Sequence, residues 1–229
     1  MAFNWKTFQT RTLTAIVFAA VMLTGLFLNY WSFLILFFVI HFGCWWEFIK
    51  LLKRIYGGWY VKYFFRGVAY ITIPVLMMID LGIDWKIYTV NNTNEVIYDK
   101  LIPCAIIFSI WINDTMAYIV GSLIGKTQLS AISPKKTWEG TIGGIILAVA
   151  VAGIIAWQFG FDIKMILMIA AISAIAGTFG DLLESKLKRM AGVKDSGSLM
   201  PGHGGFLDRF DSLLLAIPAV WLYVYFILK

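Results

Sequence analysis

The sequence has 229 residues, of which 60% are hydrophobic and only 14% are charged, and its net charge is +6. A soluble domain is nearer half apolar and a quarter charged, so this composition excludes an ordinary soluble domain and indicates an all-α integral membrane protein. Cys44 and Cys104 both lie in apolar runs, which provides neither a disulfide framework nor a zinc-binding spacing.

Seven apolar runs follow one another along the chain, each close to the roughly 20 residues that a helix needs to cross a bilayer. They cover residues 13–30, 31–49, 67–83, 101–124, 141–160, 163–183 and 207–228. We therefore expect a single membrane domain over 1–229, a polytopic bundle of about seven transmembrane helices (six to eight). Residues 1–100 would supply N-terminal helices, and 101–229 the helices of the candidate catalytic site with cytoplasmic loops at 125–140 and 184–206.

The basic residues are distributed unevenly between the loops. Of the 19 Lys and Arg residues, only four fall on one side of a seven-helix bundle, namely Lys86, Lys100, Lys164 and Lys229. The other 15 fall on the opposite side. Because Lys and Arg are enriched in cytoplasmic loops, this bias predicts a cytoplasmic N-terminus and places loop 125–140 and stretch 180–212 on the same cytoplasmic face.

One acidic residue, Glu47, closes the second apolar run beside Trp45 and Trp46. Tryptophan is enriched where a helix meets the membrane surface. This neighbourhood predicts an interfacial position for Glu47 rather than a deep one.

A second acidic residue, Asp114, lies near the middle of the fourth run. A carboxylate there costs about 2.5–3.5 kcal/mol on insertion scales, so it is usually functional or paired. Tyr118, Gly121 and Gly125 follow at helical spacing, which makes either a polar stripe lining a site or a stripe for helix packing.

The segment Ser133-Pro134-Lys135-Lys136-Thr137-Trp138-Glu139-Gly140 leads into the fifth run. Ser followed by Pro predicts an N-cap and first helical turn at Ser133 and Pro134. The paired lysines would contact either lipid head groups or a triphosphate.

Polar residues crowd together between Gly180 and Ser212. Helical spacing places Asp181, Glu184, Ser185 and Lys188 on one face, and Asp208 and Asp211 on one face of the next helix. Carboxylates at a helix N-terminus either complement its dipole or, with Asp181, provide the oxygen ligands that magnesium prefers.

A glycine-rich turn precedes that last helix. Gly202, Gly204 and Gly205 allow the backbone to approach a ligand closely, and the N–H groups at a helix N-terminus bind phosphate. Within this turn, His203 is either a proton carrier or phosphate donor, or a structural turn residue.

Together these segments resemble the signature of the phosphatidate cytidylyltransferases, also called CDP-diacylglycerol synthases. The matching residues are Asn113, Asp114, Ala117, Tyr118, the 133–140 segment, Gly180, Asp181, Glu184, Ser185, Lys188, Arg189, Lys194, Asp195, His203, Gly204, Gly205, Asp208, Arg209 and Asp211. The resemblance covers roughly residues 100–215.

The resemblance implies transfer of CMP from CTP to phosphatidate, giving CDP-diacylglycerol and pyrophosphate for phospholipid biosynthesis. The catalytic residues implied are Asp181, Asp208, Asp211, Lys194 and His203, and the three aspartates are also the metal ligands implied. The substrate-binding residues implied are Asp114, Ser133, Lys135, Lys136, Thr137, Glu139, Ser185, Lys188, Arg189, Gly204, Gly205 and Arg209.

The resemblance also implies Mg²⁺, with room for a second, monovalent cation. The expected partners are CTP, phosphatidate from the bilayer, membrane lipids and a second copy in a homodimer, but no nucleic acid. The expected location is a bacterial-type inner (plasma) membrane, with the site facing the cytoplasm. The alternatives are a related lipid-phosphate cytidylyltransferase, a polyprenol kinase, or an ion-coupled transporter that uses Asp114 and Asp181.

Overall fold

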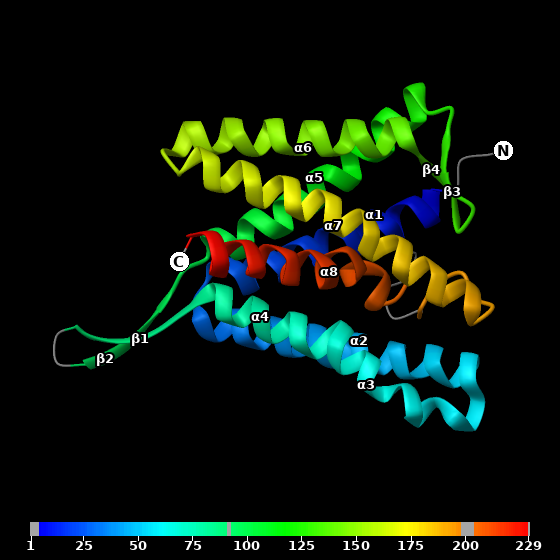
Figure 1. The fold of residues 1–229 in the computed structure, drawn as a ribbon, viewed down its shortest axis with the longest axis horizontal. Coiled ribbons are helices and arrows are strands. Elements are labelled where there is room, and N and C mark those ends of the chain that lie inside the picture. Colours follow the sequence, from blue (N-terminus) through cyan, green and yellow to red (C-terminus); the bar gives the residue numbers. More distant parts are fainter. Residues whose placement is uncertain (1–4, 91–92, 198–203, 229) are drawn as a thin grey trace.

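The computed structural model describes residues 5–90, 93–197 and 204–228. Its long helices run side by side, as Figure 1 shows. They are α1 (Trp5–Phe27), α2 (Tyr30–Tyr56), α4 (Ile73–Gly82), α5 (Leu101–Ile124), α6 (Trp138–Phe159), α7 (Ile163–Met190) and α8 (Leu207–Tyr223). Short helical segments are η1 (Gly57–Tyr63), α3 (Phe64–Gly67), η2 (Val68–Thr72) and η3 (Val224–Leu228).

Five helical stretches in the described part of the chain are long and apolar enough to cross a membrane. They are Tyr30–Gly82, Leu101–Ile124, Trp138–Phe159, Ile163–Met190 and Leu207–Leu228, and Thr12–Phe27 is a shorter apolar helix. In Figure 1 the first stretch folds back on itself, so that α4 lies beside α2. The prediction of an all-α membrane protein is confirmed, and the count of seven spanning helices stays a prediction.

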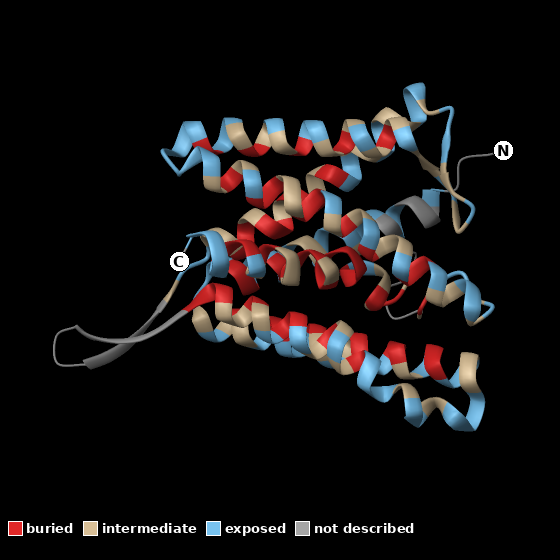
Figure 2. Cartoon of the chain, viewed as in Figure 1, coloured by how far each residue is buried: buried red, intermediate tan, exposed pale blue. Residues whose placement is uncertain are grey.

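The core of the bundle is centred on α8. Figure 2 shows most of this helix as buried, whereas α6 exposes much of its length. Apolar residues such as Ile217 and Phe37 are fully buried, and Ile146 and Phe226 are more than half exposed. In a bilayer such exposed apolar side chains face lipid, where they are in a favourable solvent.

Close backbone contacts fix the helices that form the candidate site. A methyl group on Gly144 of α6 would lie 2.9 Å from the Ala117 backbone nitrogen of α5. A methyl group on Gly180 of α7 would lie 2.5 Å from the Asp211 carbonyl oxygen of α8. Only glycine permits these approaches, so the α5–α6 and α7–α8 pairs have defined positions.

Two antiparallel hairpins interrupt the helices at segments that we expected only to be polar. Strands β1 (Ile83–Val90) and β2 (Thr93–Tyr98) form one, and β3 (Gln128–Ser130) and β4 (Ser133–Thr137) form the other. In Figure 1 they lie at opposite ends of the bundle.

The second hairpin corrects our prediction for the start of the fifth apolar helix. The pair Ser133-Pro134 belongs to β4, and the N-cap of α6 is Thr137, whose side chain accepts a hydrogen bond from the Gly140 backbone N–H (3.1 Å). The two N-cap candidates, Ser133 and Thr137, have equally suitable hydroxyls, but pairing with β3 holds Ser133 in an extended strand.

Candidate active site

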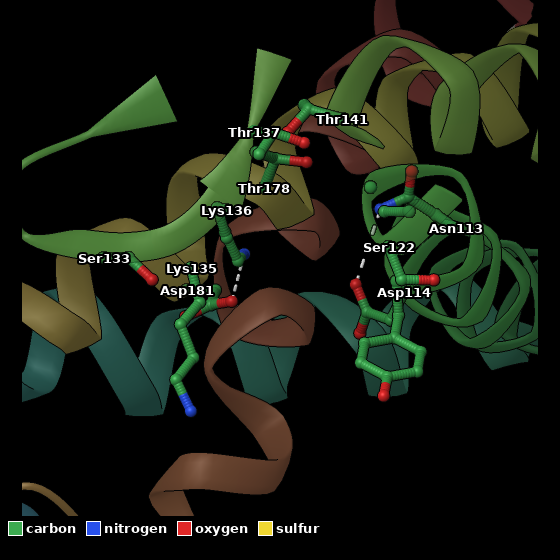
Figure 3. A pocket seen from close by; sticks show the side chains of 13 residues that line it. Asn113, Asp114, Ser122, Ser133, Lys135, Lys136, Thr137, Thr141, Thr178 and Asp181 are labelled. Carbon is green, nitrogen blue, oxygen red and sulfur yellow. Dashed lines mark hydrogen bonds and ion pairs between the residues drawn. The ribbon is translucent and has the colours of Figure 1, made fainter. Parts of the chain in front are cut away.

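A cavity of about 500 Å³ opens between α5, α6, α7 and strand β4. Figure 3 shows its polar lining. The described lining residues are Asn113, Asp114, Ala117, Tyr118, Gly121, Ser122, Ser133, Lys135, Lys136, Thr137, Thr141, Thr178 and Asp181. Loop 125–140 therefore meets the cytoplasmic-facing end predicted for α7, which confirms that these two segments lie together.

One wall of the cavity carries an ion pair between the Lys136 ammonium and the Asp181 carboxylate. Both side chains keep more than a quarter of their surface exposed, so a charged ligand can compete for either of them. In Figure 3 the neighbouring Lys135 extends in another direction from this pair. Two cations and one carboxylate on the same wall suit a multiply charged anion.

Glu139 holds the lysine-bearing strand in place from outside the cavity. Its carboxylate accepts hydrogen bonds from the backbone N–H groups of Lys126 and Thr127, all at 3.2 Å. The Trp138 N–H in turn donates to the Thr127 carbonyl (2.9 Å). Glu139 thus holds the base of the β3–β4 hairpin and does not line the first cavity, and its predicted role in substrate binding stays a prediction.

Asp114 lies on the boundary between this cavity and a second one. The second cavity measures about 430 Å³ and is lined by Thr14, Ala15, Phe18, Ala19, Trp111, Asp114, Thr115 and Arg209. It is apolar at Phe18 and Trp111 and charged at Asp114 and Arg209. The stripe of Asp114, Tyr118 and Gly121 thus lines a cavity, which decides against helix packing as its only role.

The polar residues of α7 and α8 form a separate cluster around Lys188. Its ammonium lies 2.5 Å from Glu184 Oε2 and donates a hydrogen bond to Asp208 Oδ1 (2.6 Å). Asp208 Oδ2 accepts further bonds from the Ser196 N–H and hydroxyl (both 2.9 Å) and from the Gly205 N–H (2.8 Å). The predicted helical face on α7 is confirmed, and it packs against the start of α8.

The three aspartates predicted as metal ligands occupy different surroundings. Asp181 faces the first cavity, and Asp211 is buried and accepts from the Ser212 N–H (2.6 Å). Asp208 accepts from Lys188, Ser196 and Gly205. Among the described residues no group of three His, Cys, Asp or Glu side chains is arranged to hold a metal ion. In this arrangement Asp208 would have to exchange its contact with Lys188 or Ser196 to join an ion shared by the trio, and that shared site stays a prediction.

Other predicted site residues lie away from the first cavity. The Arg189 guanidinium donates to the Val193 carbonyl (3.2 Å) at the end of α7, and Lys194 is exposed in the turn that follows. Ser185 is buried and donates to Asp181 Oδ1 (3.2 Å), so it supports a cavity residue. Gly204 has the positive φ of +82° that favours glycine. His203 and Gly202 lie outside the described residues.

Sequence reasoning missed several residues of the site. Thr178 lies one helical turn before Asp181, and Thr141 one turn after Thr137, so helical spacing from the predicted residues could have found both. For Glu47, no helical spacing from a predicted site residue indicated its contacts. This residue is only 3% exposed and bonds to the segment that leads into α8 and to the start of that helix, contacts that the sequence did not indicate, and its interfacial position stays a prediction.

Comparisons with known proteins show the family to which the chain belongs. The family profile described as "Cytidylyltransferase family" matches residues 70–227. A phosphatidate cytidylyltransferase of Staphylococcus haemolyticus (strain JCSC1435) is 48% identical over 112 residues, which are 48% of this chain and 43% of that protein. A phosphatidate cytidylyltransferase of Staphylococcus aureus (strain COL) is 46% identical over the same shares. The match thus spans less than half of these relatives' length. The chain belongs to the cytidylyltransferase family.

Proposed function

We propose that the protein transfers CMP from CTP to phosphatidate and releases pyrophosphate. The observation that carries this proposal is the pair of adjoining cavities that share Asp114, one lined by Lys135 and Lys136 and the other by Arg209, Phe18 and Trp111. A nucleotide triphosphate and a lipid phosphate each need a cationic group, and the two must meet at one point. The names of the relatives supply the lipid and the reaction type.

The first cavity suits the triphosphate of CTP. Lys135 and Lys136 offer positive charge, and the Ser133 and Thr137 hydroxyls offer hydrogen bonds. When the triphosphate binds, Lys136 would exchange its ion pair with Asp181 for one with a phosphate oxygen. Phosphoryl-group transfer depends on positioning and charge neutralisation more than on covalent chemistry by the protein, and this lining provides both.

The second cavity suits the lipid. The phosphate of phosphatidate would lie near Arg209, and an acyl chain would lie along Phe18 and Trp111. A lipid phosphate oxygen would then attack the α-phosphorus of CTP. The new bond joins the two phosphorus atoms through that oxygen, the bond from the α-phosphorus to the bridging oxygen breaks, and pyrophosphate leaves with the electron pair.

Magnesium is part of this proposal, held by fewer residues than the sequence suggested. Mg²⁺ commonly uses one or two protein carboxylates together with substrate phosphates. Asp181 is accessible in the first cavity, and the Asp211 backbone of α8 lies against Gly180, the residue before Asp181. When bound, the ion would neutralise charge on the phosphate oxygens. Asp208 would instead orient Lys188 and the turn before α8.

The proposed orientation follows from the uneven distribution of basic residues. Lys135, Lys136 and Arg209 belong to the predicted cytoplasmic side, where CTP is made available. The protein would therefore act in a bacterial-type inner membrane with both cavities reached from the cytoplasmic half. A homodimer and a second, monovalent cation also belong to the proposal, and neither is needed for the transfer of CMP.

The test is release of pyrophosphate from CTP by purified protein in mixed micelles, with and without phosphatidate. We expect release only when phosphatidate and Mg²⁺ are both present, together with a CDP-lipid product. Reaction with other lipid phosphates alone would indicate a related cytidylyltransferase. Formation of CDP and a phosphorylated polyprenol would indicate a kinase, and ion uptake without turnover would indicate a transporter.

A further inference from the structure

A buried carboxylate from the N-terminal part of the chain caps the helix that carries Arg209. Glu47 of α2 is only 3% exposed. Its Oε2 accepts a hydrogen bond from the Leu207 N–H at the start of α8 (2.9 Å), and α8 has no side-chain cap from its own N-cap residue, Phe206. The first N–H groups of a helix need partners from outside it, and Glu47 provides one.

The same carboxylate oxygen reaches the turn that leads into α8. The Ser196 hydroxyl lies 2.7 Å from Glu47 Oε2 and 2.9 Å from Asp208 Oδ2. A hydroxyl has a single hydrogen, so it can donate to only one of these two carboxylates at a time. Ser196 therefore couples Glu47 to Asp208, and through Asp208 to Lys188 of α7.

The backbone around Glu47 is shaped to admit this side chain. A methyl group on Gly197 or on Gly205 would collide with the Glu47 carboxylate. Both glycines flank the turn between α7 and α8, and a methyl group on Gly43, one turn before Glu47 on α2, would lie 2.6 Å from the Phe206 ring. The close fit on several sides distinguishes this contact from a chance hydrogen bond.

From this geometry we infer that Glu47 is a positioning residue that fixes the first turn of α8, and thereby Arg209 beside the second cavity. The inference rests on the proposed function for its kinetic consequences only. Glu47 itself does not line either cavity. Its loss should therefore impair use of the lipid phosphate and leave CTP binding, which depends on α5, β4 and α7, nearly unchanged.

The experiment compares Glu47→Ala, Glu47→Asp and Glu47→Gln in the pyrophosphate-release assay. We expect Glu47→Ala to lower kcat/KM for phosphatidate at least tenfold, since a displacement of about 1 Å can cost roughly 100-fold, with the KM for CTP within about twofold. Glu47→Gln keeps an acceptor oxygen at the same reach and should recover activity to within about threefold. Glu47→Asp is one methylene shorter and should not recover it.

Asp80→Ala is the matched control, because Asp80 also holds α8 from another helix. Its Oδ2 accepts from the Trp221 indole N–H (2.7 Å), which lies about 21 Å along α8 from Leu207 at 1.5 Å per residue. We expect Asp80→Ala to lower thermal stability while kcat/KM for phosphatidate stays within about twofold. An equal loss of kcat/KM in both alanine variants would overturn the inference, since Glu47 would then be only a stabilising contact.

Hydrogen exchange tests the inference without relying on activity. The Leu207 and Gly205 amides should exchange at least tenfold faster in Glu47→Ala, and Ser196→Ala should accelerate the same amides. Unchanged exchange would overturn the positioning role even if the wild-type protein proves active. Conversely, the wild-type protein could be inactive in the pyrophosphate-release assay while Glu47→Ala still exchanges these amides faster than wild type. That result would support the positioning role of Glu47 and reject the proposed function.

Discussion

Removing the charge of Lys136 is the most direct test of the nucleotide site. Lys136 lies on β4, faces Asp181 and lines the first cavity. We expect Lys136→Ala to raise the KM for CTP while the KM for phosphatidate stays within about twofold. The reason is that the cationic wall contacts the triphosphate, whereas the lipid would occupy the second cavity.

The size of the rise in the KM for CTP depends on two contacts of Lys136, one with the bound triphosphate and one with Asp181 in the free protein. A hydrogen bond to a charged group contributes about 1.5–3 kcal/mol. In the free protein Lys136 already has a partner, Asp181, but this pair is partly exposed and is worth at most about 1 kcal/mol. With the full 1 kcal/mol deducted, the net loss is about 0.5–2 kcal/mol, which corresponds to a rise of roughly 2–30-fold in the KM for CTP.

The control is Lys126→Ala, which removes the same charge from the same loop. Lys126 is exposed and does not line the cavity, and its backbone N–H, which bonds to Glu139, survives the change. Pyrophosphate release is measured against CTP at saturating phosphatidate for both variants. An equal KM for CTP in wild type and Lys136→Ala would refute the reasoning and assign these lysines to lipid head groups.

Five further outcomes test other parts of the proposal. Chelation of divalent cations should abolish pyrophosphate release, and Asp181→Asn should raise the Mg²⁺ concentration for half-maximal rate; an unchanged Mg²⁺ titration would exclude Asp181 as a ligand. Arg209→Ala should raise the KM for phosphatidate about tenfold with little change in the KM for CTP. A raised KM for CTP with an unchanged KM for phosphatidate would assign the second cavity to the nucleotide. Asp208→Asn should lower stability by about 1–3 kcal/mol in detergent unfolding, because a buried hydrogen-bonded charge is lost, whereas wild-type stability would contradict its tie to the α8 turn. A cysteine at Lys135 should react with an impermeant reagent only from the cytoplasmic side and one at Lys100 only from the other, while labelling of both from one side would refute the orientation.

The sequence predicted the helices well because bilayer crossing imposes a length. The apolar run 101–124 coincides with α5, and the expected shared face of Asp181, Ser185 and Lys188 is present on α7. The spacing of polar residues on one helix is a local property. It can therefore be read from the chain without knowledge of its partners.

At the start of α6, capping preferences read from the local sequence predicted the wrong first residue of the helix. Ser133-Pro134 has good N-cap chemistry, but strand pairing with Gln128–Ser130 extends the chain as far as Thr137. Tertiary contacts decided between two suitable caps. Helix α7 continues to Met190, as the shared face of Asp181, Glu184, Ser185 and Lys188 predicted, so the first seven residues of the expected cytoplasmic loop 184–206 are helical.

Glu47 could not be assigned from sequence because its partners are distant. Ser196 and Leu207 lie 149 and 160 positions away along the chain. A lone acid beside two tryptophans has the sequence character of a membrane interface. Only the packing of α2 against the start of α8 reveals that the carboxylate is enclosed.

The signature residues between Asp181 and Asp211 separate into two physical roles once the helices are packed. Asp181 and Arg209 face cavities, so they are accessible to ligands. Lys188 and Asp208 are paired with each other and with backbone groups, so their charges are already compensated. The Lys188–Asp208 pair is largely buried, whereas the Lys136–Asp181 pair is partly exposed, so a phosphate can compete for Lys136 more readily than for Lys188. The accessible pair should therefore control substrate affinity, and the compensated pair should control the geometry in which the two substrates meet.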